Sequence, residues 1–335
     1  NPPALTLEPA SLDKIYTFPY QRAQHPYYEE QGAVKALETI RFSIPTHRGC
    51  YGECNFCAIA VHEGRTVSSR SVESILDEAH RIADHPDFKG IIHDLSGPTA
   101  NMYGIECEKK LKLGACEDKR CLYPQICPVL RVDHSRQIEL LKRVRQVAGI
   151  KKVSVGSGIR YDMVLADNQC GMQYLDEVVR YHTSGQMKIA PEHTDQAVLS
   201  LMGKPSSESL LKFKDKFQML TRKAGKEQYL TYYLIAAYPG SGEKEMKSLR
   251  KFVSTTLQVN PEQVQVFTPT PSTYASVMYY TEQDPFTGKP LFVEKNLHKK
   301  AVQKQIVTGE TRRRPITGKP KPGTENPRVT TRQRR

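Results

Sequence analysis

The stretch TIRFSIPTHRGCYGECNFC, Thr39–Cys57, joins an apolar run to a loop that holds three cysteines. The run at residues 39–46 predicts a β-strand, and Cys50, Cys54 and Cys57 follow it directly. Three thiolates on one loop can ligate three irons of a 4Fe-4S cube and leave the fourth iron without a protein ligand, whereas closed electron-transfer clusters take four cysteines. An open position at a metal is where an exogenous molecule binds and is activated. The stretch therefore predicts a metal centre with one open position at the end of a strand.

Outward from this loop, short β-rich runs alternate with helical patterns. Strands are expected at residues 39–46, 88–97, 151–158, 186–193, 227–242 and 261–271. Helices are expected at residues 71–85, where Ser71 is placed as the cap, at 135–149, with a Ser cap and Gly149 at its end, and at 172–185, 194–204, 206–225 and 243–258. Six alternations predict an α/β fold, either a βα barrel or a doubly wound sheet. Polar and glycine-containing sequences follow each strand, so we expect them to meet at one face.

The chain divides by composition into a connector, a core and a basic extension. Residues 1–37 read as a connector from an upstream region, residues 38–286 as the core, and residues 287–335 as a basic C-terminal extension, largely disordered after about residue 310. The extension has a net charge of +11, which leaves +2 for the rest of the chain. Such a tail is typical either of an RNA or DNA tether or of a solubilising segment.

Eight cysteines without a secretory leader favour metal or redox chemistry over disulfides, which predicts a cytoplasmic protein. The longest apolar run, residues 229–238, is shorter than the roughly 20 residues of a membrane span. No membrane interaction is therefore expected.

A second group of cysteines lies in an insertion, residues 101–133, after the second expected strand. Four thiolates are a complete set for a closed zinc site or a second iron-sulfur cluster, so Cys107, Cys116, Cys121 and Cys127 form a possible second metal site. Ordinary thiols in an insertion and a redox pair remain alternatives. Cys170 is isolated and is read as a small buried hydrophobic residue.

The CxxxCxxC loop after the first strand, with Phe56 before its last cysteine, resembles the signature of the radical S-adenosylmethionine (SAM) enzymes. Together with the strand-end sequences DLSGPTANMYG, SVGSGIRYDM, MKIAPEHT, LIAAYPGSGEKEM and VQVFTPTPSTYASVMYYTEQDPFTGKPL, it makes residues 1–310 resemble the YgiQ-like radical SAM family, whose reaction is unassigned. The resemblance implies a partial (βα)6 TIM-like barrel and an additional N-terminal domain in longer family members. It also implies that SAM binds the open iron and is cleaved to a 5'-deoxyadenosyl radical, which abstracts hydrogen from an unknown substrate.

The resemblance also implies which side chains contact SAM. Ser96 and Gly97 stand where the family has a glycine-rich turn, but Leu95-Ser96-Gly97-Pro98 departs from the common Gly-Gly-Glu form. Ser157 and Arg160 resemble positions that meet the carboxylate or the ribose, and Arg can fork onto a carboxylate. Glu192 is expected at the ribose or the substrate, and His193 as an acid or base there. The alternative for the last two is that they cap the following helix.

Other functions remain open on the sequence alone. A structural zinc site could use the three cysteines with His47 or His62 as the fourth ligand, and the chain would then be a nucleic-acid-binding module without catalysis. Within the radical SAM class, a tRNA-modifying enzyme is a further alternative, with RNA bound by the basic tail. A radical SAM enzyme would also need a reducing electron donor such as flavodoxin or ferredoxin.

Overall fold

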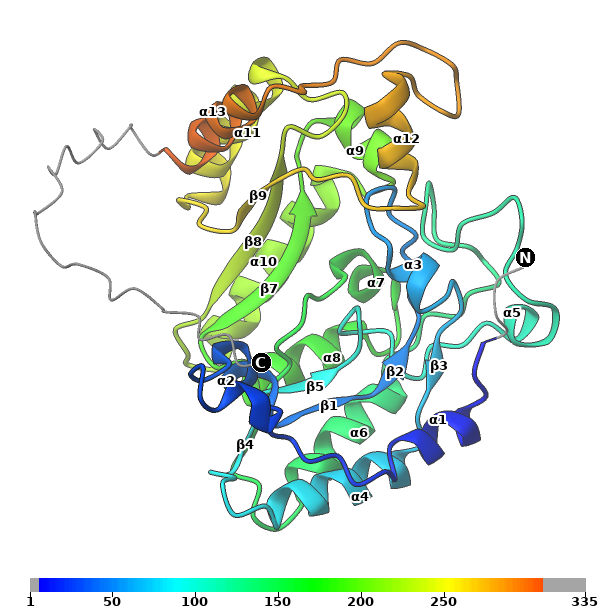
Figure 1. Ribbon diagram of the computed structural model, residues 1–335, viewed down its shortest axis with the longest axis vertical. Helices are drawn as coiled ribbons and strands as arrows, with labels where there is room; N and C mark the ends of the chain where they lie inside the picture. Colours follow the sequence, from blue (N-terminus) through cyan, green and yellow to red (C-terminus); the bar gives the residue numbers. More distant parts are fainter. Residues whose placement is uncertain (1–5, 310–335) are drawn as a thin grey trace, which may run out of the picture.

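The computed structural model describes residues 6–309, so the predicted disorder of the basic tail after residue 310 lies outside the described residues. The predicted strands form short parallel segments in the middle of the molecule, with helices around them (Figure 1). In chain order, these parallel strands are β1 (Ser43–Pro45), β4 (Ile91–Ile92), β5 (Asp94–Ser96), β6 (Lys152–Val153), β7 (Gln186–Glu192), β8 (Tyr229–Ala236) and β9 (Val264–Val266). A separate antiparallel pair is formed by β2 (His47–Arg48) and β3 (Ser68–Ser69).

β4 and β5 both lie in the second predicted strand, residues 88–97, and when they are counted as one position the parallel strands are neighbours in chain order. β1 pairs with β5, β4 with β6, β7 with β8, and β8 with β9, all in parallel. A parallel bridge between Ile159 and Ile189 joins the loop after β6 to β7. A doubly wound sheet reverses its strand order at a switch point, and no reversal occurs here. The α/β fold with six successive parallel strand positions is therefore confirmed; among residues 6–309, β1 and β9 each have a parallel partner on one side only, so the arrangement is open.

The helices fill the intervals between the strands. They are α1 (Pro9–Ile15), α2 (Lys35–Ile40), α3 (Ile59–His62), α4 (Val72–Ala83), α5 (Glu108–Leu113), α6 (Ser135–Arg145), α7 (Tyr161–Ala166), α8 (Gly171–Glu177), α9 (Gln196–Met202), α10 (Ser207–Lys223), α11 (Glu243–Phe252), α12 (Tyr274–Thr281) and α13 (Leu297–Thr308). A short 3₁₀ turn, η1 (Pro26–Tyr28), lies in the N-terminal segment, and π-helical turns η2 (Val178–His182) and η3 (Val253–Leu257) extend α8 and α11.

The main core lies between the strands and the helices that follow them. Buried side chains from both layers form one cluster, among them Ile44, Ile92, Val153, Ile189 and Leu234 from the strands and Ile75, Leu141, Leu175, Phe213 and Leu249 from the helices. Their burial supplies the main driving force for this arrangement. It leaves the strand ends and their loops free to form a site.

One local prediction is confirmed and two need correction. Ser71 caps α4 as expected, its Oγ accepting from Ser74 N–H at 3.1 Å, but α6 has His134 at its capping position and Ser135 inside the helix. His134 is fixed there by the Asp167 carboxylate, which accepts from its backbone N–H at 2.9 Å. The first strand is also shorter than predicted, because residues 39 and 40 belong to α2.

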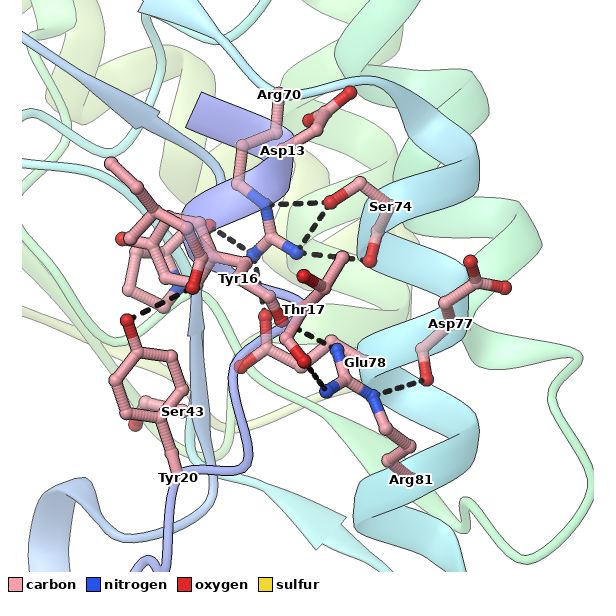
Figure 2. A network of polar contacts seen from close by, with 12 residues as sticks. Asp13, Tyr16, Thr17, Tyr20, Ser43, Arg70, Ser74, Asp77, Glu78 and Arg81 are labelled. Atoms are coloured by element: carbon pink, nitrogen blue, oxygen red, sulfur yellow. Dashed lines mark hydrogen bonds and ion pairs between the residues drawn. The ribbon is translucent and has the colours of Figure 1, made fainter. Parts of the chain in front are cut away.

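An N-terminal segment, residues 6–40, lies along α4 and is held there by a polar network (Figure 2). The guanidinium of Arg70, 1 % exposed, stacks 3.9 Å from the ring centre of Tyr16 and donates to the Pro45 carbonyl at 2.9 Å and to Glu78 at 2.5 Å. Glu78 also pairs with Arg22 of the same segment. Because Pro45 ends β1, this network ties the N-terminal segment to the strand that precedes the cysteine loop.

Candidate active site

The cysteine loop is held by backbone hydrogen bonds from distant parts of the chain. Cys50 N–H donates to the Gly64 carbonyl at 3.2 Å, and Cys57 N–H closes a turn on the Cys54 carbonyl at 3.0 Å. Asn55 N–H donates to the Met202 carbonyl at 2.9 Å, at the end of α9. The bond of Asn55 fixes the middle of the loop against the end of α9.

The three predicted thiols line one cavity of about 670 Å³. Gly52 leaves room for them, because a Cβ at this position would lie 3.2 Å from Cys50 Sγ and 3.6 Å from Cys54 Sγ. The sulfurs of Cys50 and Cys54 thus lie beside the same point, and only glycine keeps that space free. The two thiols therefore have a space beside them that a single methyl group would fill. Such a space is expected where a compact inorganic group lies against a loop.

The surroundings of Cys50 and Cys57 favour the neutral thiol over the thiolate. Burial raises the pKa of Cys50, although the Thr99 hydroxyl, 3.2 Å from its sulfur, acts in the opposite direction. Burial also raises the pKa of Cys57 to about 11. Thiols bind metals as thiolates, so a positively charged centre has to displace their protons. The donor set fits an iron-sulfur cluster, whose irons supply that charge.

Arg160 reaches this cavity from the N-terminus of α7. Its Nε donates to Asp162 at 2.7 Å, its Nη1 lies 3.5 Å from Cys54 Sγ, and its Nη2 is buried without a partner. Asn101 fixes the backbone, since its Oδ1 accepts from Arg160 N–H at 2.7 Å and its Nδ2 donates to the Arg160 carbonyl at 3.0 Å. Burial acts to lower the pKa of Arg160, but Asp162 and Cys54 outweigh it and raise that pKa. The guanidinium is therefore charged, rigid and able to donate one more hydrogen bond.

The residues predicted around SAM are divided between two adjoining cavities. Ser157 lines the cavity of the three cysteines, whereas Ser96 and Gly97 line a smaller one of about 370 Å³; Ser157 and Asp94 form walls of both. Asp94 joins the strand ends, accepting from Ser157 Oγ at 2.5 Å, from Gly156 N–H at 2.7 Å and from Ser96 Oγ at 2.8 Å. The structure thus brings Ser157 and Ser96 together through one carboxylate.

Glu192 and His193 have different surroundings. Glu192 lines the cysteine cavity at the end of β7, with a positive φ of 67° at a bulge. Its burial raises the pKa of its carboxyl, against the opposing effect of Lys204 and Arg160. His193 is not among the lining residues; its Nδ1 accepts from Asp195 N–H at 2.9 Å, and Asp195 caps α9. The residue that caps α9 is Asp195, so both the acid or base role and the capping role of His193 stay predictions.

The proposed zinc ligands do not gather around one ion. His47 is buried, hydrogen-bonds Thr46 at 2.9 Å and lines the smaller cavity, as does His62. Within residues 6–309, no group of three or more His, Cys, Asp or Glu side chains is arranged to hold a single metal ion. This result does not exclude a 4Fe-4S cluster. Each thiolate of such a cluster binds a different iron, so its cysteine sulfurs lie farther apart than sulfurs that bind a single ion.

The sequence analysis missed two residues that line the cavity, Asp94 and Lys204, and two that hold Arg160, Asn101 and Asp162. Asp94 stands two residues before Ser96, a predicted site position, so its place at a strand end was a usable signal. Asn101 and Asp162 act on Arg160 through contacts across the fold, and Lys204, which lines the cavity, lies beyond α9. No sequence spacing indicates those three.

Comparisons with known proteins identify relatives of this chain. The family model described as radical SAM N-terminal matches residues 1–43, and a domain of unknown function, DUF3362, matches residues 262–312. A UPF0313 protein of Fusobacterium nucleatum is 57 % identical over 94 % of this chain and 55 % of its own length. A UPF0313 protein of Methanosarcina mazei is 47 % identical over 92 % of this chain and 48 % of its own length. The chain thus spans about half the length of these curated relatives.

Solved structures resemble the chain only weakly. One is the radical SAM methyltransferase TsrM from Kitasatospora setae with tryptophan and a SAM analogue bound, at 14 % identity and a TM-score of 0.41 over 67 % of this chain and 35 % of TsrM. Another is the cobalamin-dependent SAM radical enzyme OxsB with aqua-cobalamin and SAM bound, at 17 % identity and a TM-score of 0.45 over 74 % of this chain and 31 % of OxsB. At these scores the likeness carries no argument about this chain.

Proposed function

Because the chain belongs to the radical SAM superfamily and to the family of the UPF0313 proteins, we propose that it is the core of a radical SAM enzyme. Cys50, Cys54 and Cys57 would hold the 4Fe-4S cluster. When bound, that cluster supplies an electron for cleavage of SAM to methionine and a 5'-deoxyadenosyl radical, which takes hydrogen from a substrate. The observation that carries the proposal is the single cavity in which all three thiols lie with Arg160, whose Nη2 is buried and unpartnered.

Arg160 is the residue best placed to bind the carboxylate of SAM. A buried donor without a partner costs free energy, which a ligand oxygen at Nη2 would recover. The Asp162 carboxylate and the Asn101 side chain hold the guanidinium in place, so little conformational freedom is lost on binding. The contact of Nη1 with Cys54 Sγ sets the carboxylate position next to the cysteine loop.

The hydroxyl-bearing part of SAM would meet the polar wall of the cavity. Ser157 and Asp94 lie on one side and Glu192 on another. A carboxyl whose pKa is raised by burial, as in Glu192, both donates and accepts when protonated, which suits the hydroxyl pair of a ribose. Ser96 and Gly97, in the adjoining cavity, act on this wall through Asp94.

The remaining lining keeps water from the reacting atoms. Phe56, Ile59, Ile159, Tyr161 and Ile235 contribute apolar surface to the same cavity. Phe56 is held by an edge contact with Tyr238, their ring centres 6.3 Å apart. A dry cavity prevents side reactions of a radical, which is the protein's main contribution to such chemistry.

The partners follow from this chemistry. A one-electron donor protein, such as a flavodoxin or a ferredoxin, has to reduce the site, and a substrate of undefined class has to reach it. RNA binding by the basic tail stays a prediction, because residues 310–335 lie outside the described part. Within residues 6–309, no helix is long and apolar enough to cross a membrane, and a cytoplasmic location is part of the proposal.

The proposal is tested by product formation. Protein reconstituted anaerobically with iron and sulfide is mixed with SAM and dithionite, and 5'-deoxyadenosine is measured by mass spectrometry. We expect product from the wild type and from the matched control Cys170→Ala, and none above background from Cys54→Ala. An iron-loaded, SAM-bound wild type that gives no more product than Cys54→Ala would contradict the proposal.

A further inference from the structure

A second, larger cavity lies on the other side of the cysteine loop. Its volume is about 1000 Å³, and its walls come from the insertion, from α9 and from residues 284–291. Asn55 lines this cavity, whereas its chain neighbours Cys54 and Phe56 line the first one. The loop of the three cysteines therefore forms a partition between two cavities.

All four cysteines of the insertion line this second cavity: Cys107, Cys116, Cys121 and Cys127. Each of them is a free thiol, and Cys107 and Cys121 are both only 5 % exposed. Cys127 N–H donates to the Cys121 carbonyl at 2.7 Å, which closes a turn between them. Four cysteines from one short insertion thus line one cavity as free thiols.

The insertion is joined to the first cysteine group by two polar contacts. Tyr51 follows Cys50 directly, and its hydroxyl accepts from Cys107 N–H at 3.1 Å. Lys110, only 2 % exposed, donates to the Arg65 carbonyl at 2.7 Å and lies 3.4 Å from Glu53 of the CxxxCxxC loop. These contacts set the two groups side by side with Tyr51 between them.

The charge of the cavity suits an anionic occupant. Lys110 also lies close enough to Cys121 for a side-chain hydrogen bond with its sulfur. Cationic side chains outnumber acidic ones in the lining, with Lys109, Lys110, Lys119, Arg120 and Lys289 against Asp118 and Asp284. Four thiolates on an iron-sulfur core carry net negative charge, which buried and nearby cations stabilise.

We propose that Cys107, Cys116, Cys121 and Cys127 hold a second iron-sulfur cluster, closed by four protein thiolates. A single zinc ion would need the sulfurs around one point, and no such group occurs among residues 6–309. The proposal does not depend on SAM cleavage, because none of these four cysteines lines the first cavity.

The test separates the second cluster from the first. Cys50→Ala/Cys54→Ala/Cys57→Ala protein is reconstituted anaerobically, desalted and analysed for iron, sulfide and zinc, with Mössbauer spectra to identify the iron. We expect this variant to keep about two to four iron atoms per chain with matching sulfide, as four-cysteine clusters contain. Adding Cys107→Ser and Cys121→Ser should abolish that iron, whereas adding Cys170→Ser should leave it unchanged.

Several outcomes would overturn the inference. The first is a triple variant that is folded by circular dichroism but holds no iron. The second is a folded triple variant that holds one zinc ion instead of iron. Iron that survives Cys107→Ser and Cys121→Ser would be bound elsewhere and would overturn it as well. If wild type loads iron but SAM has no effect on it, the proposed function fails, while the iron content of the triple variant still decides the second cluster.

Discussion

Replacing Arg160 with alanine tests how the cavity binds SAM. The variant removes the unpartnered Nη2 and the Nη1 contact with Cys54, and it leaves Asp162 buried without its 2.7 Å partner. A hydrogen bond to a charged group contributes about 1.5–3 kcal/mol, so the Kd for SAM should rise about 10- to 150-fold. Arg160→Lys keeps the positive charge but lacks the forked guanidinium, so we expect a rise in the Kd for SAM that is smaller than that of Arg160→Ala.

The assay is equilibrium dialysis of SAM with reconstituted protein, with iron measured in every sample so that cluster loss is not mistaken for weaker binding. Arg143→Ala serves as the matched control, because its guanidinium is exposed and contacts only Glu73 and not the cavity. A Kd for Arg160→Ala within twofold of wild type at equal iron content would refute the reasoning.

Three further predictions concern the loop, the N-terminal segment and pH. Gly52→Ala should lower iron content after reconstitution, because its methyl group would lie 3.1 Å from Arg160 Nη1 and 3.2 Å from Cys50 Sγ, whereas Gly158→Ala, with nothing within 4 Å of its Cβ, should load normally; equal iron in both would contradict this. Arg70→Ala should lower the free energy of unfolding in urea by about 1–3 kcal/mol, since it removes one of the two arginine partners of the buried Glu78 carboxylate and leaves Arg22; an unchanged free energy of unfolding would show that the network is dispensable. Burial lowers the pKa of His47 and His193 to about 4, below that of an unfolded chain, so the unfolded state binds more protons and stability should fall by about 3 kcal/mol per histidine as pH drops from about 6.5 to 4. His193→Gln should show a shallower fall in the urea midpoint, and an unchanged pH dependence would contradict the assignment.

The strands and most helices could be predicted because their periodicity is local. Ile189 in β7 and Leu234 in β8 are buried as the apolar runs indicate. Helix α13 was not predicted, because its sequence is basic. Its Lys300 is nevertheless 4 % exposed, with Nζ donating to the Tyr279 hydroxyl at 3.0 Å, and the helix lies beside α11 (Figure 1). A buried lysine paired with a distant tyrosine leaves no signal in the local pattern.

The three cysteines that line the cavity are evident from the sequence, whereas the residues around them are harder to predict. Cysteine spacing on one loop is a local property, and the structure brings Cys50, Cys54 and Cys57 to one cavity. The role of Asp94 depends on the pairing of strand ends, since its partners Gly156 and Ser157 lie about sixty residues away. Such contacts follow from the tertiary fold and not from any one segment.

The most direct test of the central claim is the electron paramagnetic resonance spectrum of the dithionite-reduced protein with and without SAM. It requires neither a substrate nor an upstream domain. If SAM binds the open iron of a 4Fe-4S cluster held by Cys50, Cys54 and Cys57, the spectrum should change when SAM is added to the wild type, and Cys107→Ser/Cys121→Ser protein should show the same change. An identical spectrum in both conditions, in protein shown by dialysis to have SAM bound, would contradict the account.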